Sequence, residues 1–250
     1  LIKELRTHSS FLEGENFAHG EKGWLDNNNS LYYNACIRLK HLVMNEDPRS
    51  FLQWDVMQKT MVIGNEDYVK IELEYLRSND WPRYEKAIQE VPVGKPNFSN
   101  IYPESSGNLI HHAYHVAQFE NITSSNINDI DFIFEFGGGY GGMYRLCHNL
   151  GFDGKYIIFD FPMFSALQEY FIKSNGLEVH NVDSFESAKH GVICVSDIQI
   201  LQDLLLTNIS SRDKNMFIAT WSLSESPVDL RYKILSLISE FKAFLFAFQG

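Results

Sequence analysis

The stretch Asp131–Gly142, with the sequence DFIFEFGGGYGG, constrains the fold of this chain more than any other feature. Its first part, Phe132–Phe134, is apolar without alternation, which is typical of a parallel strand covered on both faces. An acid, Glu135, follows, and the next segment holds five glycines in six residues. Glycine adopts positive φ and lets a ligand lie against bare backbone, while the first turn of the following helix offers free N–H groups. The pattern predicts the strand–turn–helix unit of a nucleotide-binding α/β domain.

Two classes of ligand fit this glycine turn. Gly137, Gly139 and Gly142 satisfy the dinucleotide fingerprint, and Asp160 lies where a ribose-binding acid belongs. The same turn, preceded by Glu135, also has the pattern of S-adenosylmethionine (SAM) methyltransferases. A carboxylate at that position repels a pyrophosphate and attracts the sulfonium and ammonium groups of SAM. The position of the acid therefore favours SAM, with NAD and a purely structural turn as the alternatives.

Length, charge and hydropathy exclude several classes of protein. The 250 residues have room for one α/β domain and a smaller part. A formal net charge of −11 argues against binding to nucleic acid or to an anionic membrane surface. No apolar run approaches the roughly 18–20 residues of a membrane span, and no charged-then-apolar leader opens the chain. Three cysteines without regular spacing do not form a disulfide framework. The predicted location is the cytoplasm.

Residues 1–105 lack the alternation of strands and helices. Residues 31–44 and 67–77 have helical spacing, and Asp80-Trp-Pro82 begins another helix. The following segment, 91–107, is rich in proline and glycine and is interpreted as a loop. We predict that this part of the chain is a helical cap over an active site, although its sequence indicates no chemistry.

Residues 106–250 alternate between helices and strands, which predicts a doubly wound, mostly parallel, Rossmann-like α/β sheet. A helix over residues 110–119 leads into the glycine-turn strand. Ser226-Pro227-Val228-Asp229 predicts a helix with a serine N-cap. The further predicted strands are 155–161, 178–182, 191–196, 216–221 and 243–248.

Ligands of such sheets bind beyond the carboxyl ends of the strands. Asp160, which follows the second strand, is predicted to accept hydrogen bonds from ribose hydroxyls, with a turn at the strand end or an N-cap before Pro162 as the alternatives. Asp197 either contacts the adenine amino group or caps its own helix. The predicted cofactor contacts are Glu135, Gly137, Gly138, Gly139, Asp160, Phe161, Asp197, Trp221 and Ser222.

Two groups of residues are candidates for a catalytic base. In the polar cluster at 221–226, Ser226 is explained by capping, whereas Glu225 has no structural role visible in the sequence. His111, His112 and His115 lie on one predicted helix, and an unperturbed imidazole pKa near ~6.5 suits proton removal. His111 and His115 have the spacing of a metal-binding pair, but the sequence places no third ligand, and we predict no metal. Glu225 is preferred, with His112 and His115 as the other candidates.

Three segments taken in order resemble the sugar O-methyltransferases, SAM-dependent enzymes associated with bacterial surface polysaccharides. These segments are Phe134–Gly142, Tyr156–Pro162 and Trp221–Glu225, and the resemblance covers about residues 107–250. It implies a class I methyltransferase fold and a sugar hydroxyl as methyl acceptor near Glu225. The chain departs from the family pattern at Ala219 and Ser226, which bears on the acceptor rather than on the cofactor. The resemblance implies SAM contacts at Glu135, Gly137, Gly139 and Asp160.

Methyltransferases of this fold finish with an antiparallel strand pair, which would follow Gly250. We therefore expect the domain to be truncated at its carboxyl end, with a sheet edge near residues 243–248 and either a homodimer contact or a disordered tail there. The predicted function is methyl transfer from SAM to a hydroxyl of a small-molecule or glycan acceptor. The alternatives are an NAD-dependent oxidoreductase, against which no Tyr-x-x-x-Lys relay is found, and a non-catalytic binding or assembly module.

Overall fold

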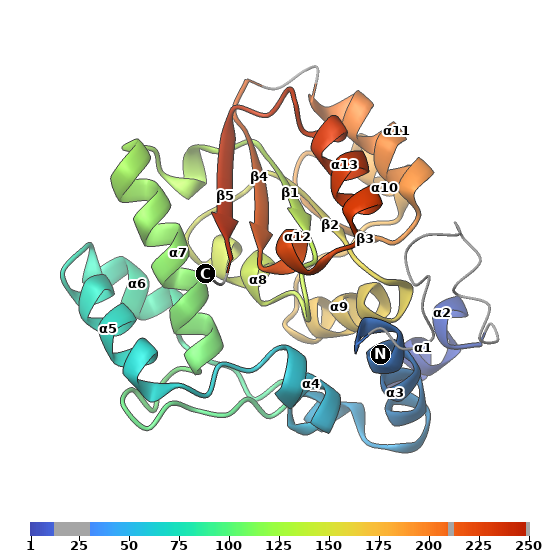
Figure 1. Cartoon of the computed structure of the whole chain (residues 1–250), viewed down its shortest axis with the longest axis horizontal. Helices are drawn as coiled ribbons and strands as arrows, with labels where there is room; N and C mark the ends of the chain where they lie inside the picture. Colours follow the sequence, from blue (N-terminus) through green and yellow to red (C-terminus); the bar gives the residue numbers. More distant parts are fainter. Residues whose placement is uncertain (13–30, 210–212, 249–250) are drawn as a thin grey trace.

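A computed structural model describes residues 1–12, 31–209 and 213–248 of the chain. Five parallel strands form one sheet in the order β3-β2-β1-β4-β5, flanked by helices on both faces (Figure 1). The predicted Rossmann-like α/β fold is therefore confirmed. The strands are β1 (Phe132–Phe136), β2 (Lys155–Phe159), β3 (Gly191–Val195), β4 (Asn215–Thr220) and β5 (Ala243–Ala247).

The strand order places the carboxyl ends of β1 and β4 side by side at the point where the chain reverses its direction across the sheet. β1 pairs with β2 on one side and with β4 on the other, so that Glu135 lies opposite both Ile158 and Ile218. All residues of β1, β2 and β4 are buried, which explains their unalternating apolar sequences. A crevice at such a reversal is the usual ligand site of doubly wound sheets.

The helices form a layer on each face of the sheet. One face packs against α7 (Gly107–Thr123), α8 (Gly142–Asn149) and α9 (Pro162–Ser174). The other packs against the second layer, in which Phe185, Leu201 and Ile234 are buried. This second layer consists of α10 (Val182–Ser187), α11 (Ile198–Ile209) and α13 (Val228–Leu237), and the short α12 (Ser222–Glu225) follows β4.

The amino-terminal part is helical, as predicted, and joins the same core as α7, α8 and α9. Phe51 is fully buried, with its ring centroid 6.1 Å from that of Tyr140 and 6.0 Å from that of Phe171. The division of the chain near residue 105 stays a prediction. The elements of this part are α1 (Ile2–Thr7), α2 (Ser9–Leu12), α3 (Leu31–Asn45), η2 (Pro48–Gln53), α4 (Asp55–Thr60), α5 (Glu66–Arg77) and α6 (Trp81–Ala87), and η3 (Ile127–Asp129) precedes β1.

Two local predictions were wrong. Residues 178–182 form no strand, because Val179 makes only an isolated bridge to Val192, and Asn181 and Ser184 close a capping box that begins α10. Ser226 does not cap α13, which begins at Val228 after Pro227. Its hydroxyl instead donates a hydrogen bond 2.6 Å long to the Ser222 carbonyl, so the serine closes the α12 turn.

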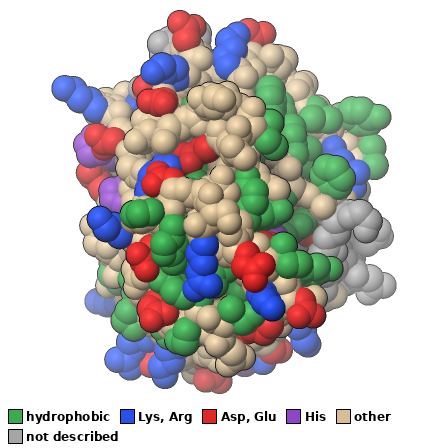
Figure 2. Space-filling view, turned by 90° about the vertical axis from the view of Figure 1, so that its left-hand side faces the viewer, with side chains coloured by type: hydrophobic (Ala, Val, Ile, Leu, Met, Phe, Trp, Pro, Cys, Tyr) green, Lys and Arg blue, Asp and Glu red, His purple; other side chains and the backbone are tan. Residues whose placement is uncertain are grey.

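The sheet has an edge at β5, as predicted. Its only strand partner among the described residues is β4. Phe244 and Phe246 are 41% and 43% exposed, and Tyr232 of α13 is 70% exposed. Hydrophobic side chains gather on the right-hand side of the view in Figure 2. The homodimer contact at this edge stays a prediction. Among the described helices, none has the length and apolar character required to cross a membrane.

Candidate functional site

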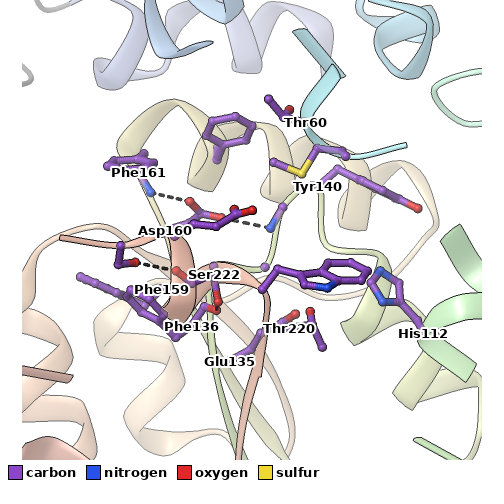
Figure 3. A pocket seen from close by; sticks show the side chains of 18 of the residues that line it. Thr60, His112, Glu135, Phe136, Tyr140, Phe159, Asp160, Phe161, Thr220 and Ser222 are labelled. Atoms are coloured by element: carbon purple, nitrogen blue, oxygen red, sulfur yellow. Dashed lines mark hydrogen bonds between the residues drawn. The ribbon is translucent and has the colours of Figure 1, made fainter. Parts of the chain in front are cut away.

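A cavity of about 400 Å³ lies where β1, β2 and β4 end (Figure 3). Its walls come from the glycine turn, the residues that follow β2 and β4, the segment before α13, and residues 59–63 of the amino-terminal part. The cavity therefore occupies the reversal point of the sheet, where the sequence places its candidate ligand contacts. The predicted contacts that line it are Glu135, Gly137, Gly138, Gly139, Asp160, Phe161, Trp221 and Ser222.

The glycine turn is shaped by left-handed backbone conformations. Gly137 has φ +74° and Gly139 has φ +59°, which side-chain-bearing residues rarely adopt. A Cβ atom built on Gly137 would lie 2.2 Å from the Cβ atom of Ser222, so the turn and the residues after β4 are in direct contact. The Ser222 hydroxyl donates a hydrogen bond to the Phe136 carbonyl, which gives this serine a structural role in the site.

Glu135 is a buried acid at the floor of the cavity, 2% exposed. Its carboxylate accepts a hydrogen bond of 2.8 Å from the Tyr156 hydroxyl. The pKa of Glu135 is raised to about 8, mainly because the group is buried. The hydrogen bond from Tyr156 lowers this pKa, and the neighbouring Asp160 contributes to raising it. The charged form of this carboxyl group is therefore costly until a positive charge comes close.

Asp160 ties the second strand to the glycine turn. Its carboxylate accepts hydrogen bonds from the amides of Gly139 (3.0 Å) and Phe161 (2.8 Å) and from Gln168 Nε2 (2.9 Å). Figure 3 shows the carboxylate pointing toward these backbone groups at the cavity wall. Burial raises the pKa of Asp160 to about 7 even though the three donors lower it. In the described part of the chain, no side-chain bond caps α9, so the role of helix cap does not fit, whereas the bond to the Phe161 amide agrees with a turn at the strand end. The ribose contact stays a prediction.

Glu135 and Asp160 together make the floor of the cavity acidic. Among the described residues, no cationic group shifts the pKa of either carboxyl group, and none forms a hydrogen bond with it. Two buried acids whose pKa values are both raised favour a ligand that carries positive charge.

Trp221 is held in a strained conformation beside the cavity, with φ 63° and ψ −33°. Such backbone angles in a bulky residue are uncommon and cluster at functional sites. Its indole stacks on the His111 ring with centroids 4.7 Å apart and planes 7° apart. The predicted base Glu225 also lines the cavity and is exposed, which places it at the cavity mouth.

The three predicted histidines differ in whether they reach the cavity. Of the three, only His112 lines the cavity, and its buried Nδ1 atom has no hydrogen-bond partner among the described residues. Burial, assisted by His111 and His115, lowers the pKa of His112 to about 3. His115 lies behind the wall with its Nε2 atom 2.9 Å from His111 Nε2, and burial lowers its pKa to about 3 as well. His111 bonds to the Glu72 carboxylate.

Asp197 lies outside the lining of the cavity. Its carboxylate accepts hydrogen bonds from the amides of Gln199 (2.8 Å) and Ile200 (3.0 Å), the arrangement of a helix N-cap. Of its two predicted roles, capping therefore fits the geometry. In the described part of the chain, no three His, Cys, Asp or Glu residues are grouped so as to hold a metal ion.

The sequence did not indicate the contribution of residues 59–63. They line the cavity and reach the glycine turn at Gly139, although they lie more than 70 positions before it in the chain. Met61, Val62 and Ile63 are apolar, as core residues are, and no motif distinguishes them. Tyr140, within the glycine-rich stretch, also lines the cavity and was not predicted as a contact.

Comparisons with known proteins were negative at three levels. No family model matches the chain, and no curated protein and no solved structure matches it.

Proposed function

We propose that the protein is a SAM-dependent methyltransferase and that SAM binds in the cavity at the glycine turn. The observation that carries the proposal is the pair of buried acids, Glu135 and Asp160, on the cavity floor without a cation beside them among the described residues. SAM brings a sulfonium and an ammonium group, and either would favour the ionised form of these carboxyl groups.

The same acids argue against a dinucleotide. A pyrophosphate carries negative charge, and it binds where backbone N–H groups are free to donate. Here the Gly139 amide already donates to Asp160, and that carboxylate would repel the phosphates. Both features disfavour the NAD alternative.

The size and lining of the cavity also fit SAM. A volume of about 400 Å³ lies within the range of pockets for ligands of this size. Aromatic side chains at the ends of β1 and β2, among them Phe136, Phe159 and Phe161, provide apolar walls for an adenine ring.

For the acceptor we propose a hydroxyl group, in keeping with the resemblance of three segments to sugar O-methyltransferases. Bound SAM would supply an electrophilic methyl group, and the residues of the chain would orient the acceptor and remove its proton. Glu225 at the cavity mouth is the proposed base. His112 is less suited, because an imidazole whose pKa is about 3 takes up a proton weakly at neutral pH.

We expect SAM affinity to rise with pH between 6 and 8.5. The carboxyl groups of Glu135 and Asp160 lose their protons through pKa values of about 8 and about 7, and only the ionised forms attract a cation. Glu135→Gln should weaken binding by about 5–100-fold at pH 8.5 and flatten the pH profile. Isothermal calorimetry across this pH range measures both effects.

Glu74→Gln is the matched control, since Glu74 is exposed on α5 outside the cavity lining and its replacement changes the net charge equally. An affinity that is independent of pH in the wild type and unchanged in Glu135→Gln would refute the proposed role of the acid.

A further inference from the structure

A short connection from the amino-terminal part closes one side of the cavity. Residues 61–64, here called the strap, join α4 to α5, and Met61, Val62 and Ile63 of the strap line the cavity. Thr60, the residue just before the strap, lies on the side of the cavity opposite Glu135 in Figure 3.

Asn108, in the first turn of α7, holds the strap at two points. Its side-chain oxygen accepts a hydrogen bond of 2.7 Å from the Ile63 amide, and its Nδ2 donates to the Met61 carbonyl. The Asn108 side chain is 7% exposed and also forms a hydrogen bond with the hydroxyl of Tyr140, which lies within the glycine-rich stretch. One buried amide therefore connects the strap, α7 and the glycine turn.

The strap in turn sets the position of a thioether over the glycine turn. A Cβ atom built on Gly139 would lie 2.8 Å from Met61 Sδ, so the sulfur packs against the bare backbone at that glycine. A thioether is apolar and polarisable and has no N–H or O–H to donate. Phosphate groups need such donors, whereas the apolar atoms and the sulfur of SAM do not.

We propose that Met61 contacts the ligand at the glycine turn and disfavours phosphates there, and that Asn108 is the positioning residue that keeps Met61 in place. The contact with the ligand rests on the proposed function, whereas the positioning by Asn108 does not. Loss of the Asn108 amide would leave the strap without its two side-chain hydrogen bonds, and the strap would move away from the turn.

A thiol placed on the strap measures its position without any ligand. In Met61→Cys, the reaction of residue 61 with a thiol reagent is followed in its own peptide, because the half-buried Cys194 can also react, and its rate is compared between the single variant and the double variant with Asn108→Ala. We expect the double variant to react faster, because residue 61 is half-buried while the strap is held and becomes more exposed when the strap loses its two hydrogen bonds. Equal rates would overturn the positioning role.

Two controls separate local opening from unfolding. Asn121→Ala removes an exposed asparagine of the same helix α7, whose side chain donates a hydrogen bond to the Tyr75 hydroxyl, and should leave the rate unchanged. Cys36 and Cys147 are fully buried, so their protection shows that the rest of the core is intact. Should Asn108→Ala unfold the protein, Asn108→Asp keeps the acceptor for Ile63, loses the donor to Met61, and should give a smaller acceleration.

SAM is then added to the Met61→Cys variant. Slower labelling at saturating SAM, at least about tenfold, is the expected result if residue 61 contacts the ligand. Unchanged labelling while calorimetry shows SAM bound would overturn the contact and leave the proposed function standing. If SAM does not bind at all, the contact fails with the proposed function, and the rates without ligand still decide the role of Asn108.

Discussion

Gly139→Leu is expected to lower SAM affinity by more than about 100-fold, a loss of over about 2.7 kcal/mol. Gly139 has φ +59°, and its Cβ position lies 2.8 Å from Met61 Sδ. A leucine side chain would therefore displace the Met61 thioether and extend into the cavity beside it, where we propose that the ligand lies. A leucine at this positive φ would also be in an unfavourable backbone conformation. Calorimetric titration with S-adenosylhomocysteine, the demethylated product, gives the same comparison without turnover.

Gly176→Leu is the matched control for this substitution. Gly176 also has a positive φ, +75°, but among the described residues no heavy atom beyond its chain neighbours lies within 4 Å of its Cβ position, and it is outside the cavity lining. It should lose stability through backbone strain alone and bind SAM with unchanged affinity. If Gly139→Leu bound as tightly as Gly176→Leu, the ligand would not lie at the glycine turn.

Glu225→Gln is expected to reduce methyl transfer by a factor on the order of 10²–10⁴ and to leave SAM affinity nearly unchanged. The amide keeps the shape of the side chain and loses its basicity. Turnover is measured as transfer of a labelled methyl group to a hydroxylated acceptor that is active with the wild type. The effect should appear in kcat rather than in the dissociation constant of SAM.

Asp229→Asn is the control for the loss of one charge, since Asp229 is exposed in the first turn of α13 and lies outside the cavity lining. It should retain full turnover. If Glu225→Gln retained turnover and His112→Ala lost it, the proton would go to the histidine, and Glu225 would only orient the acceptor.

The sheet was predictable because its signals are local. Phe132–Phe134 and the glycines after Glu135 specify a buried strand, a turn and a helix within one short stretch, and the parallel order follows from their alternation with later elements. The carboxyl ends of parallel strands lie at one edge of the sheet, so Glu135, Asp160 and Trp221 were predicted to lie around one cavity, and they do.

The rest of the site depends on contacts between residues far apart in the chain. Asn108 bonds to the strap 45 and 47 positions earlier, and no sequence period marks such a pair. The sequence also could not predict which histidine faces the cavity. His112 and His115 lie on one helix, and the packing of that helix decides which of them reaches the cavity. Residues 178–182 were predicted to form a strand, and they include the β-branched Val179 and Val182. The capping box of Asn181 and Ser184 instead begins a helix there.

The central claim is that the cavity binds SAM through a floor of two buried acids. The most direct test is to titrate the wild-type protein at pH 8 with SAM and with NADH in parallel by calorimetry. We predict saturable binding of one SAM per chain and no heat of binding with NADH. Saturable binding of NADH, or the absence of SAM binding by a folded protein, would contradict the account.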